Sequence, residues 1–134
     1  MGRPDADIAR LGYERFASGD VEGFLELLHP DIDWGTSGLF PGMRARYVGH
    51  DEVVEFFHTF MDTWEALEIE ILEMRDVADG VLVHARFFAR GRGGVEVDRR
   101  FAQHMTIEDG RLRRIRTWPE WPEALRALGL DRGV

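Results

Sequence analysis

Apolar residues recur at helical spacing in two segments near the N-terminus. Between residues 5 and 18 they fall on roughly one side of a helix, at Ile8, Leu11, Tyr13 and Phe16. Asp20 is a good N-cap for a second helix. The apolar face of that helix is expected to hold Val21, Phe24, Leu25 and Leu28. Pro30 is expected to end it, because the residue before a proline avoids the α region.

The pattern shortens before a third, longer helix begins. Residues 32–34 and 44–48 are expected to form two short strands, separated by a loop rich in Gly, Ser and Pro. Asp51 and Glu52 favour a helix start, because the helix dipole stabilises anions in the first turn. One side of this helix is expected to carry Val53, Phe57, Phe60, Met61 and Trp64.

After Leu67 the apolar period changes to two, which predicts a strand that alternates Ile69 and Ile71 with glutamates. Three more strands are expected over residues 81–90, 95–107 and 111–118, each joined to the one before by a glycine-containing turn. Pro119 and Pro122 suit the first turn of a short closing helix.

Helices therefore come first and strands later, which predicts an α+β fold. We expect the 134 residues to form a single domain, over residues 1–134. Its sheet is expected to have about six strands, antiparallel except toward one edge, and to be curled into a cone around three helices. A short C-terminal helix is expected to follow the last strand.

Composition excludes several kinds of chemistry. The chain has no Cys and no Lys, so thiol nucleophiles, thiolate metal sites, Schiff-base lysines and P-loop lysines are absent. Its 25 acidic residues against 17 Arg give a net charge of -8, which argues against general nucleic-acid binding. No apolar run reaches the roughly 18 residues that span a membrane. We therefore expect a cytoplasmic protein with no membrane partner.

Several segments together resemble a known family. They are residues 17–24, 28–34, 47–51, 107–112 and 123–130. In this order they are similar to the nuclear transport factor 2-like superfamily, in its SnoaL-like polyketide cyclase and ketosteroid isomerase-like branch. The resemblance implies a curved sheet wrapped around a deep pocket, and a homodimer formed through the outer face of the sheet. It also implies that no metal or organic cofactor is used.

Ketosteroid isomerases in this superfamily use an aspartate base, with a tyrosine and a protonated aspartate as oxyanion donors. By the resemblance, the base falls at Thr36, the acidic donor at Gln103 and the tyrosine at Gly12, one residue before Tyr13. Tyr13 takes the donor role only if this register is off by one, since one residue turns a helical side chain by about 100°. We do not predict ketosteroid isomerase activity.

The same resemblance fixes which strand residues face the cone. Those expected to face inward are Val83, Ala85, Phe87, Phe101, Gln103, Met105, Ile107, Ile115 and Thr117. Those expected to face outward are His84, Arg86, Phe88, Arg100, His104, Arg114, Arg116 and Trp118. An outer face of Arg, His and aromatic residues is typical of an interface. The five histidines show no metal-ligand spacing, so no metal site is predicted.

Candidate ligand contacts follow from these positions, although the aromatic residues also fit a plain core. The candidates are Trp34, Thr36, Tyr47, Phe57, Phe60, Trp64, Ala85, Phe87, Phe101, Gln103, Met105 and Thr117. Gln103 and Thr117 either orient a ligand or bond each other and water. His58 and Tyr13 are the candidates for moving a proton.

Two main hypotheses result. In the first, the cone binds a small, largely apolar or aromatic molecule, and a catalytic form would isomerise, cyclise, dehydrate or hydrolyse it without a cofactor. In the alternative, the protein is a non-catalytic ligand-binding or dimerisation module whose pocket is filled by side chains. An open cavity of several hundred cubic ångströms holding a titratable group favours an enzyme, whereas a filled one favours the module. An adaptor for a macromolecule would instead need a large exposed apolar patch.

Overall fold

The computed structural model describes residues 4–37 and 43–130. The elements are α1 (Asp5–Ala17), α2 (Val21–Glu26), β1 (Leu28–Gly35), β2 (Arg46–Val48), α3 (Gly49–Thr63), β3 (Trp64–Val77), β4 (Gly80–Gly91), β5 (Glu96–Glu108), β6 (Arg111–Trp118) and α4 (Trp121–Ala127). None of the described helices is long and apolar enough to cross a membrane.

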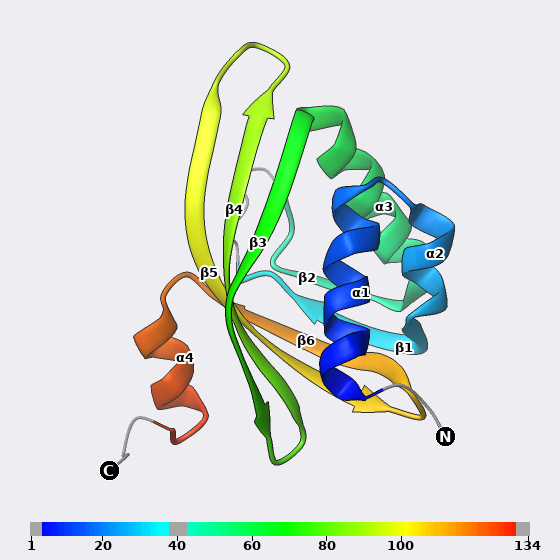
Figure 1. The fold of residues 1–134 in the computed structure, drawn as a ribbon. Helices are drawn as coiled ribbons and strands as arrows, with labels where there is room; N and C mark the ends of the chain where they lie inside the picture. The colour runs from blue at the N-terminus through cyan, green and yellow to red at the C-terminus, as the bar shows by residue number, and fades with distance from the viewer. Residues whose placement is uncertain (1–3, 38–42, 131–134) are drawn as a thin grey trace.

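One six-stranded sheet joins all the strands, in the order β2-β1-β6-β5-β4-β3. Every neighbouring pair is antiparallel except β1 and β6, which are parallel. The sheet curls, and α1, α2 and α3 lie on its concave side, whereas α4 lies on the other side (Figure 1). This arrangement confirms the expected α+β cone with a mixed sheet.

The turn between α1 and α2 forms as the sequence predicts. The Asp20 carboxylate caps α2 by accepting the Gly23 N–H at 2.9 Å. A Cβ at Gly23 would overlap the Asp20 carboxylate, so a larger residue there would require the capping side chain to move. Gly19, at φ 77°, adopts the left-handed conformation that ends α1.

The predicted end of α2 is wrong. The helix stops at Glu26, and Leu28 and Pro30 both belong to β1. The cause is tertiary, because Leu28 pairs with Leu112 of β6 and the Leu112 N–H donates to the Leu27 carbonyl at 2.7 Å. Strand pairing therefore overrides a helical apolar spacing that continues as far as Leu28.

The apolar face of α3 also differs from the prediction at its end. Trp64 is not helical, since α3 ends at Thr63 and Trp64 begins β3 opposite Gly91. The face includes Phe56, which is 1% exposed and which the expected set omitted. Phe56 lies three residues after Val53, a spacing that places both on one side of a helix.

The inward set of strand residues is buried as expected, except that Ile107 is only half-buried. The outward set differs at one position. His104, expected at an exposed interface, is 5% exposed, and its Nε2 lies 2.9 Å from Asp79 Oδ1.

The helix α4 covers the part of the outer face next to His104, since Leu82 pairs with His104 and packs against this helix. It packs on the outer face of the sheet, where Ala124 forms a small core with Leu82 and Ala102. Trp121 of the same helix stacks on His84, with 4.9 Å between ring centroids. Part of the face expected to bind a second subunit is therefore covered by the chain itself.

Candidate functional site

The interior of the cone is lined almost entirely by apolar side chains. They leave a cavity of about 40 Å³ between the helices and the sheet. The helices contribute Gly12, Tyr13, Phe16, Phe24, Phe56 and Phe60. The sheet contributes Trp34, Ile69, Phe87, Phe101, Gln103, Met105, Leu112 and Ile115. The Phe16 ring is central to this lining, with its centroid 5.6 Å from that of Phe24 and 5.1 Å from that of Phe60.

A chain of buried hydrogen bonds runs through the polar part of this lining. The Tyr13 hydroxyl donates to Gln103 Oε1 at 2.7 Å, and Gln103 Nε2 donates to Thr117 Oγ1 at 3.0 Å. The Thr117 carbonyl in turn accepts from the Ser37 hydroxyl. Tyr13 therefore reaches Gln103 despite the one-residue difference in register, and the expected pairing of Gln103 with Thr117 is present.

Tyr13 is the one titratable residue in the described lining of the cavity. Burial raises the pKa of its hydroxyl above the usual value, because the phenolate would lose its hydration. The hydroxyl therefore stays protonated at neutral pH and acts as a hydrogen-bond donor. A proton-abstracting group, by contrast, would have to come from outside this described lining.

Trp34, which also lines the cavity, carries a buried polar atom. It is 6% exposed, and its ring lies between the aromatic rings of α1 and α3, with 6.0 Å to Phe16 and 4.6 Å to Phe56. Its Nε1 is the one fully buried side-chain nitrogen or oxygen without a hydrogen-bond partner among the described residues. Buried donors are rarely left unpaired in native proteins.

An open groove of about 800 Å³ adjoins the cavity between α1 and the edge strand β3. Arg10 and Glu14 line its helical wall, and β3 and β4 supply the opposite wall. Tyr13 and Ile69 line both the groove and the cavity. These two side chains therefore form a partition between the cavity and the groove.

The structure brings about half of the candidate ligand contacts to the cavity. Those that line it are Trp34, Phe60, Phe87, Phe101, Gln103 and Met105. Thr117 lies one hydrogen bond behind Gln103. Phe57, Trp64 and Ala85 are not part of the described lining.

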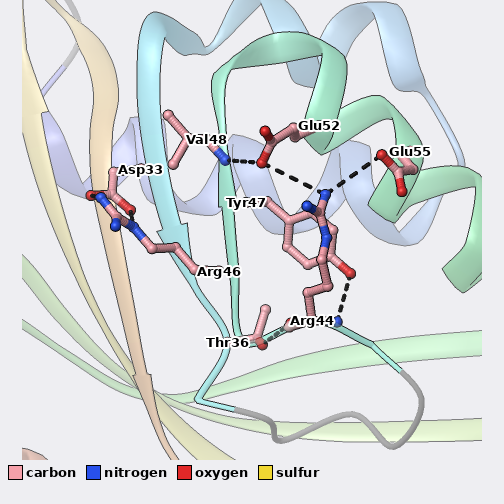
Figure 2. A network of polar contacts seen from close by, with 8 residues as sticks. All are labelled: Asp33, Thr36, Arg44, Arg46, Tyr47, Val48, Glu52 and Glu55. Carbon is pink, nitrogen blue, oxygen red and sulfur yellow. Dashed lines mark hydrogen bonds and ion pairs between the residues drawn. The ribbon is translucent and has the colours of Figure 1, made fainter.

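Thr36 and Tyr47 lie instead in a network that joins β2 to α3 (Figure 2). The Thr36 hydroxyl donates to the Arg44 carbonyl at 2.8 Å, and the Arg44 N–H donates to the Tyr47 hydroxyl at 3.0 Å. The Arg44 guanidinium lies over the Tyr47 ring and within 3.6 Å of both Glu52 and Glu55. Thr36 therefore has a structural partner at the position where ketosteroid isomerases have their base.

His58 is not part of the cavity. Its side chain is exposed on α3, whereas the phenylalanines that line the cavity occupy the buried side of the helix. Helical spacing alone does not show whether a residue on the flank of a helix reaches the interior, because successive side chains are turned by only about 100°. As a result, Tyr13 is the candidate for proton movement that the structure places at the cavity.

The expected contacts omitted Gly12, Phe16, Phe24, Phe56, Ile69, Leu112 and Ile115, which also line the cavity. Helical spacing identified Phe16 and Phe24 as buried, and strand alternation did so for Ile69 and Ile115. What the sequence lacked was a signal that distinguishes cavity walls from ordinary core.

One group of possible metal ligands occurs among the described residues, His29 with Glu108 and Asp109, whose ligand atoms lie within 4.8 Å of one another. His29 Nδ1 accepts the Asp31 N–H at 3.0 Å, and Glu108 pairs with Arg113 at 3.3 Å. A metal-bound histidine normally donates its second ring N–H to an acceptor, which this Nδ1 does not do. His29 and Glu108 therefore already have protein partners.

Comparisons with solved structures support the fold. TerC, crystallised with polyporic acid, shares 22% identity over 94% of this chain and 98% of that chain, with a TM-score of 0.77. A nuclear transport factor 2-like protein of unknown function from Burkholderia pseudomallei shares 23% identity over 91% and 95%, with a TM-score of 0.77. Rv0760c from Mycobacterium tuberculosis, in complex with estradiol-17β-hemisuccinate, shares 18% identity over 89% and 95%, with a TM-score of 0.75.

At the sequence level, no curated protein matches the chain. The family model for the SnoaL-like domain matches residues 9–115. This match covers most of the chain and all of the described cavity lining. The protein therefore belongs to the SnoaL-like domain family.

Proposed function

We propose that this protein binds a small, neutral, largely apolar or aromatic molecule in the cavity of the cone. The observation that carries the proposal is an aromatic interior in which Tyr13, Gln103 and Trp34 supply the polar atoms. Ligand pockets typically combine apolar walls with a few such groups. A charged ligand is disfavoured, because the described lining has no ionised side chain to offset the loss of its hydration.

Two structural relatives give independent support for an aromatic or polycyclic ligand. TerC was crystallised with polyporic acid, and Rv0760c was solved with an estradiol derivative. Both share with this chain the cone in which the cavity lies.

Ligand entry requires the interior to expand. An apolar cavity of about 150 Å³ is known to admit benzene, whereas this cavity measures about 40 Å³. Met105 can yield, since its side chain is unbranched and flexible. Displacement of Tyr13 and Ile69 would join the cavity to the adjoining groove of about 800 Å³. We propose this partition as the entrance.

A catalytic form of the proposal relies on Tyr13 as a neutral donor. A hydroxyl held protonated in a dry site stabilises negative charge that develops on a substrate oxygen. This supports isomerisation, cyclisation, dehydration or hydrolysis steps in which such an oxygen takes part. Neither a cofactor nor an enzymatic activity is required for the binding proposal.

The small cavity favours the alternative function, a non-catalytic module whose pocket is filled by its own side chains. In that case the outer face of the sheet would be the functional surface, as a homodimer interface. The cytoplasmic location expected from the sequence stays a prediction.

A cavity-filling variant separates these two functions. Gly12 lines the cavity, and a Cβ there would make an ordinary contact of 3.6 Å with Leu112. Gly12→Met should fill the space while α1 is retained, since methionine is a good helix former. Binding of ethylbenzene, followed by calorimetry, should be lost in Gly12→Met and unchanged in His58→Ala, whose site is exposed on α3. If the parent protein binds no apolar aromatic probe, the filled-module function is supported instead.

A further inference from the structure

Among the described polar residues that line the cavity, Trp34 has a hydrogen-bond donor without an acceptor. Tyr13 already donates its hydroxyl hydrogen to Gln103, and Gln103 donates to Thr117. Trp34 Nε1 is buried and has no partner among the described residues. An unpaired buried donor lowers the stability of the folded protein. A protein that retains such a donor therefore uses it in function, for example to bind a molecule that supplies the missing acceptor.

Trp34 lies one row along the sheet from Gln103, the residue that accepts from the Tyr13 hydroxyl. Trp34 pairs with Ile115, which pairs with Met105, so these three inward residues form one row across β1, β6 and β5. Gln103 and Thr117 form the next inward row along β5 and β6. Polar side chains therefore occupy two neighbouring rows of the sheet. Gln103 and Thr117 in one row are hydrogen-bonded to each other, whereas the Trp34 N–H in the other row has no partner among the described residues.

From this asymmetry we infer that Trp34 is the residue that orients the ligand, by donating its indole N–H to a carbonyl or ether oxygen of a neutral aromatic molecule. The inference rests on the proposed function and adds the chemical class of the ligand. An oxygen bound at Trp34 gains a hydrogen bond without breaking one, whereas an oxygen bound at Tyr13 would compete with Gln103. A single water that occupies the cavity beforehand would be replaced by a ligand atom that repeats its hydrogen bond.

The residues that line the cavity also indicate that the ligand is neutral and carries a hydrogen-bond acceptor. The indole N–H is a donor only, so it recognises an acceptor oxygen and not a hydrogen-bond donor. A carboxylate would be an acceptor too, but the described lining holds no cation to balance it. The ligand class is therefore an aromatic ketone, aldehyde, ether or quinone.

Two probes of nearly equal shape test this inference. Acetophenone carries a carbonyl oxygen where ethylbenzene has a methylene group, and neither is charged. Both would be titrated by calorimetry into the parent protein, Trp34→Phe and Trp118→Phe, the last being a matched control on the outer face of the sheet. We expect Trp34→Phe to weaken acetophenone binding about tenfold, the effect of one lost hydrogen bond, and ethylbenzene binding less than about threefold.

The indole N–H resonances of the parent protein give a second measurement that does not depend on a variant. The chain has four tryptophans, so labelling them with nitrogen-15 gives a simple spectrum. Acetophenone should move the Trp34 Nε1–H resonance further downfield than ethylbenzene does, because both rings contribute ring-current shifts but only the ketone accepts the N–H hydrogen.

The outcomes are separable. If acetophenone binds but moves the Trp34 resonance no further downfield than ethylbenzene does, and Trp34→Phe weakens the binding of both probes equally, the inference is overturned. Binding of ethylbenzene alone also overturns it, but leaves the proposed function intact. If neither probe binds, the proposed function fails, and the role of Trp34 fails with it.

Discussion

Three residues of the interior, Tyr13, Gln103 and Thr117, form an internally bonded polar group. None of them is charged at neutral pH, and each side chain is hydrogen-bonded to the next, so the buried polar atoms of this group have partners inside an otherwise apolar interior. The amide of Gln103 is the centre of the chain, because it accepts on one side and donates on the other. Its removal leaves two hydroxyls unpaired.

A double-mutant cycle tests this coupling. Gln103→Leu should lower the free energy of unfolding by about 1–3 kcal/mol, because the Tyr13 and Thr117 hydroxyls lose a buried partner. Adding Tyr13→Phe to Gln103→Leu should cost less than Tyr13→Phe does in the parent protein. Urea denaturation of the four proteins measures this. Additive changes in the free energy of unfolding would show that the hydrogen bond contributes nothing.

The burial of Tyr13 also predicts a dependence on alkaline pH. Its pKa is raised in the folded state, so the unfolded chain releases this proton first and stability falls as the pH rises above about 10. The slope should approach about 1.4 kcal/mol per pH unit for this one group. The chain has two tyrosines and no lysine or cysteine, so few other groups titrate there.

Denaturation measured between pH 9 and 12 should show this fall in the parent protein and a smaller one in Tyr13→Phe. Equal slopes in both proteins would contradict the assignment of the raised pKa to Tyr13.

Among the elements, β1 and β4 illustrate how partners define a strand. Leu28 continues the helical apolar spacing of α2, but it belongs to β1 because it pairs with Leu112 of the parallel strand β6. The start of β4 is set by Gly80, whose φ is 155° and where a Cβ would overlap the Met105 carbonyl of the adjacent strand. Backbone approach of this kind admits only glycine.

Gly80→Ala should therefore lower the free energy of unfolding by about 1–3 kcal/mol, as expected for a strained backbone. Gly93→Ala is the matched control, because a Cβ at Gly93 meets no atom within 4 Å. Thermal denaturation should show a clear drop in Tm for the first variant and almost none for the second. Equal Tm values would mean that the β4–β5 pairing can shift to admit the methyl group.

At the scale of the whole molecule, the outer face of the sheet combines opposite charges on different strands. Glu68, Glu70 and Glu73 of β3 lie on this face, with Arg114 and Arg116 of β6 toward its other side. Two copies related by a two-fold axis could place the acidic strand of one copy on the basic strand of the other, as isologous interfaces require. α4 limits the contact to the part of the face it leaves open.

Arg116→Glu should weaken self-association, because it removes one of these basic groups and adds an acidic one. Arg10→Glu makes the same change in charge on α1, which lies on the concave side of the sheet, and should leave the mass unchanged (Figure 1). Light scattering over a range of protein concentrations measures both. A dimer mass that persists in Arg116→Glu would locate the contact elsewhere, and a monomeric parent protein would exclude the dimer.

Much of the fold could be predicted from the chain alone, because its signals are local. Periods of 3.6 and two distinguish helices from strands, and Asp20 and the glycine turns mark their limits. The prediction for the end of α2 was wrong because the strand pairing that ends this helix is not local. Leu28 pairs with a residue more than eighty positions away in the sequence. The prediction that His104 is exposed was wrong for the same reason, because α4, which lies later in the sequence, covers part of that face of the sheet.

Residue type and spacing were enough to predict the order of elements, the alternation of strand residues between two faces and the apolar character of the interior, and the family resemblance indicated which face is inward. Tertiary packing was needed to show which aromatic side chains enclose the cavity, that Tyr13 reaches Gln103 and that His58 is exposed. It also decided that the Trp34 N–H lacks a partner. These facts depend on packing among distant segments, which spacing along one chain does not encode.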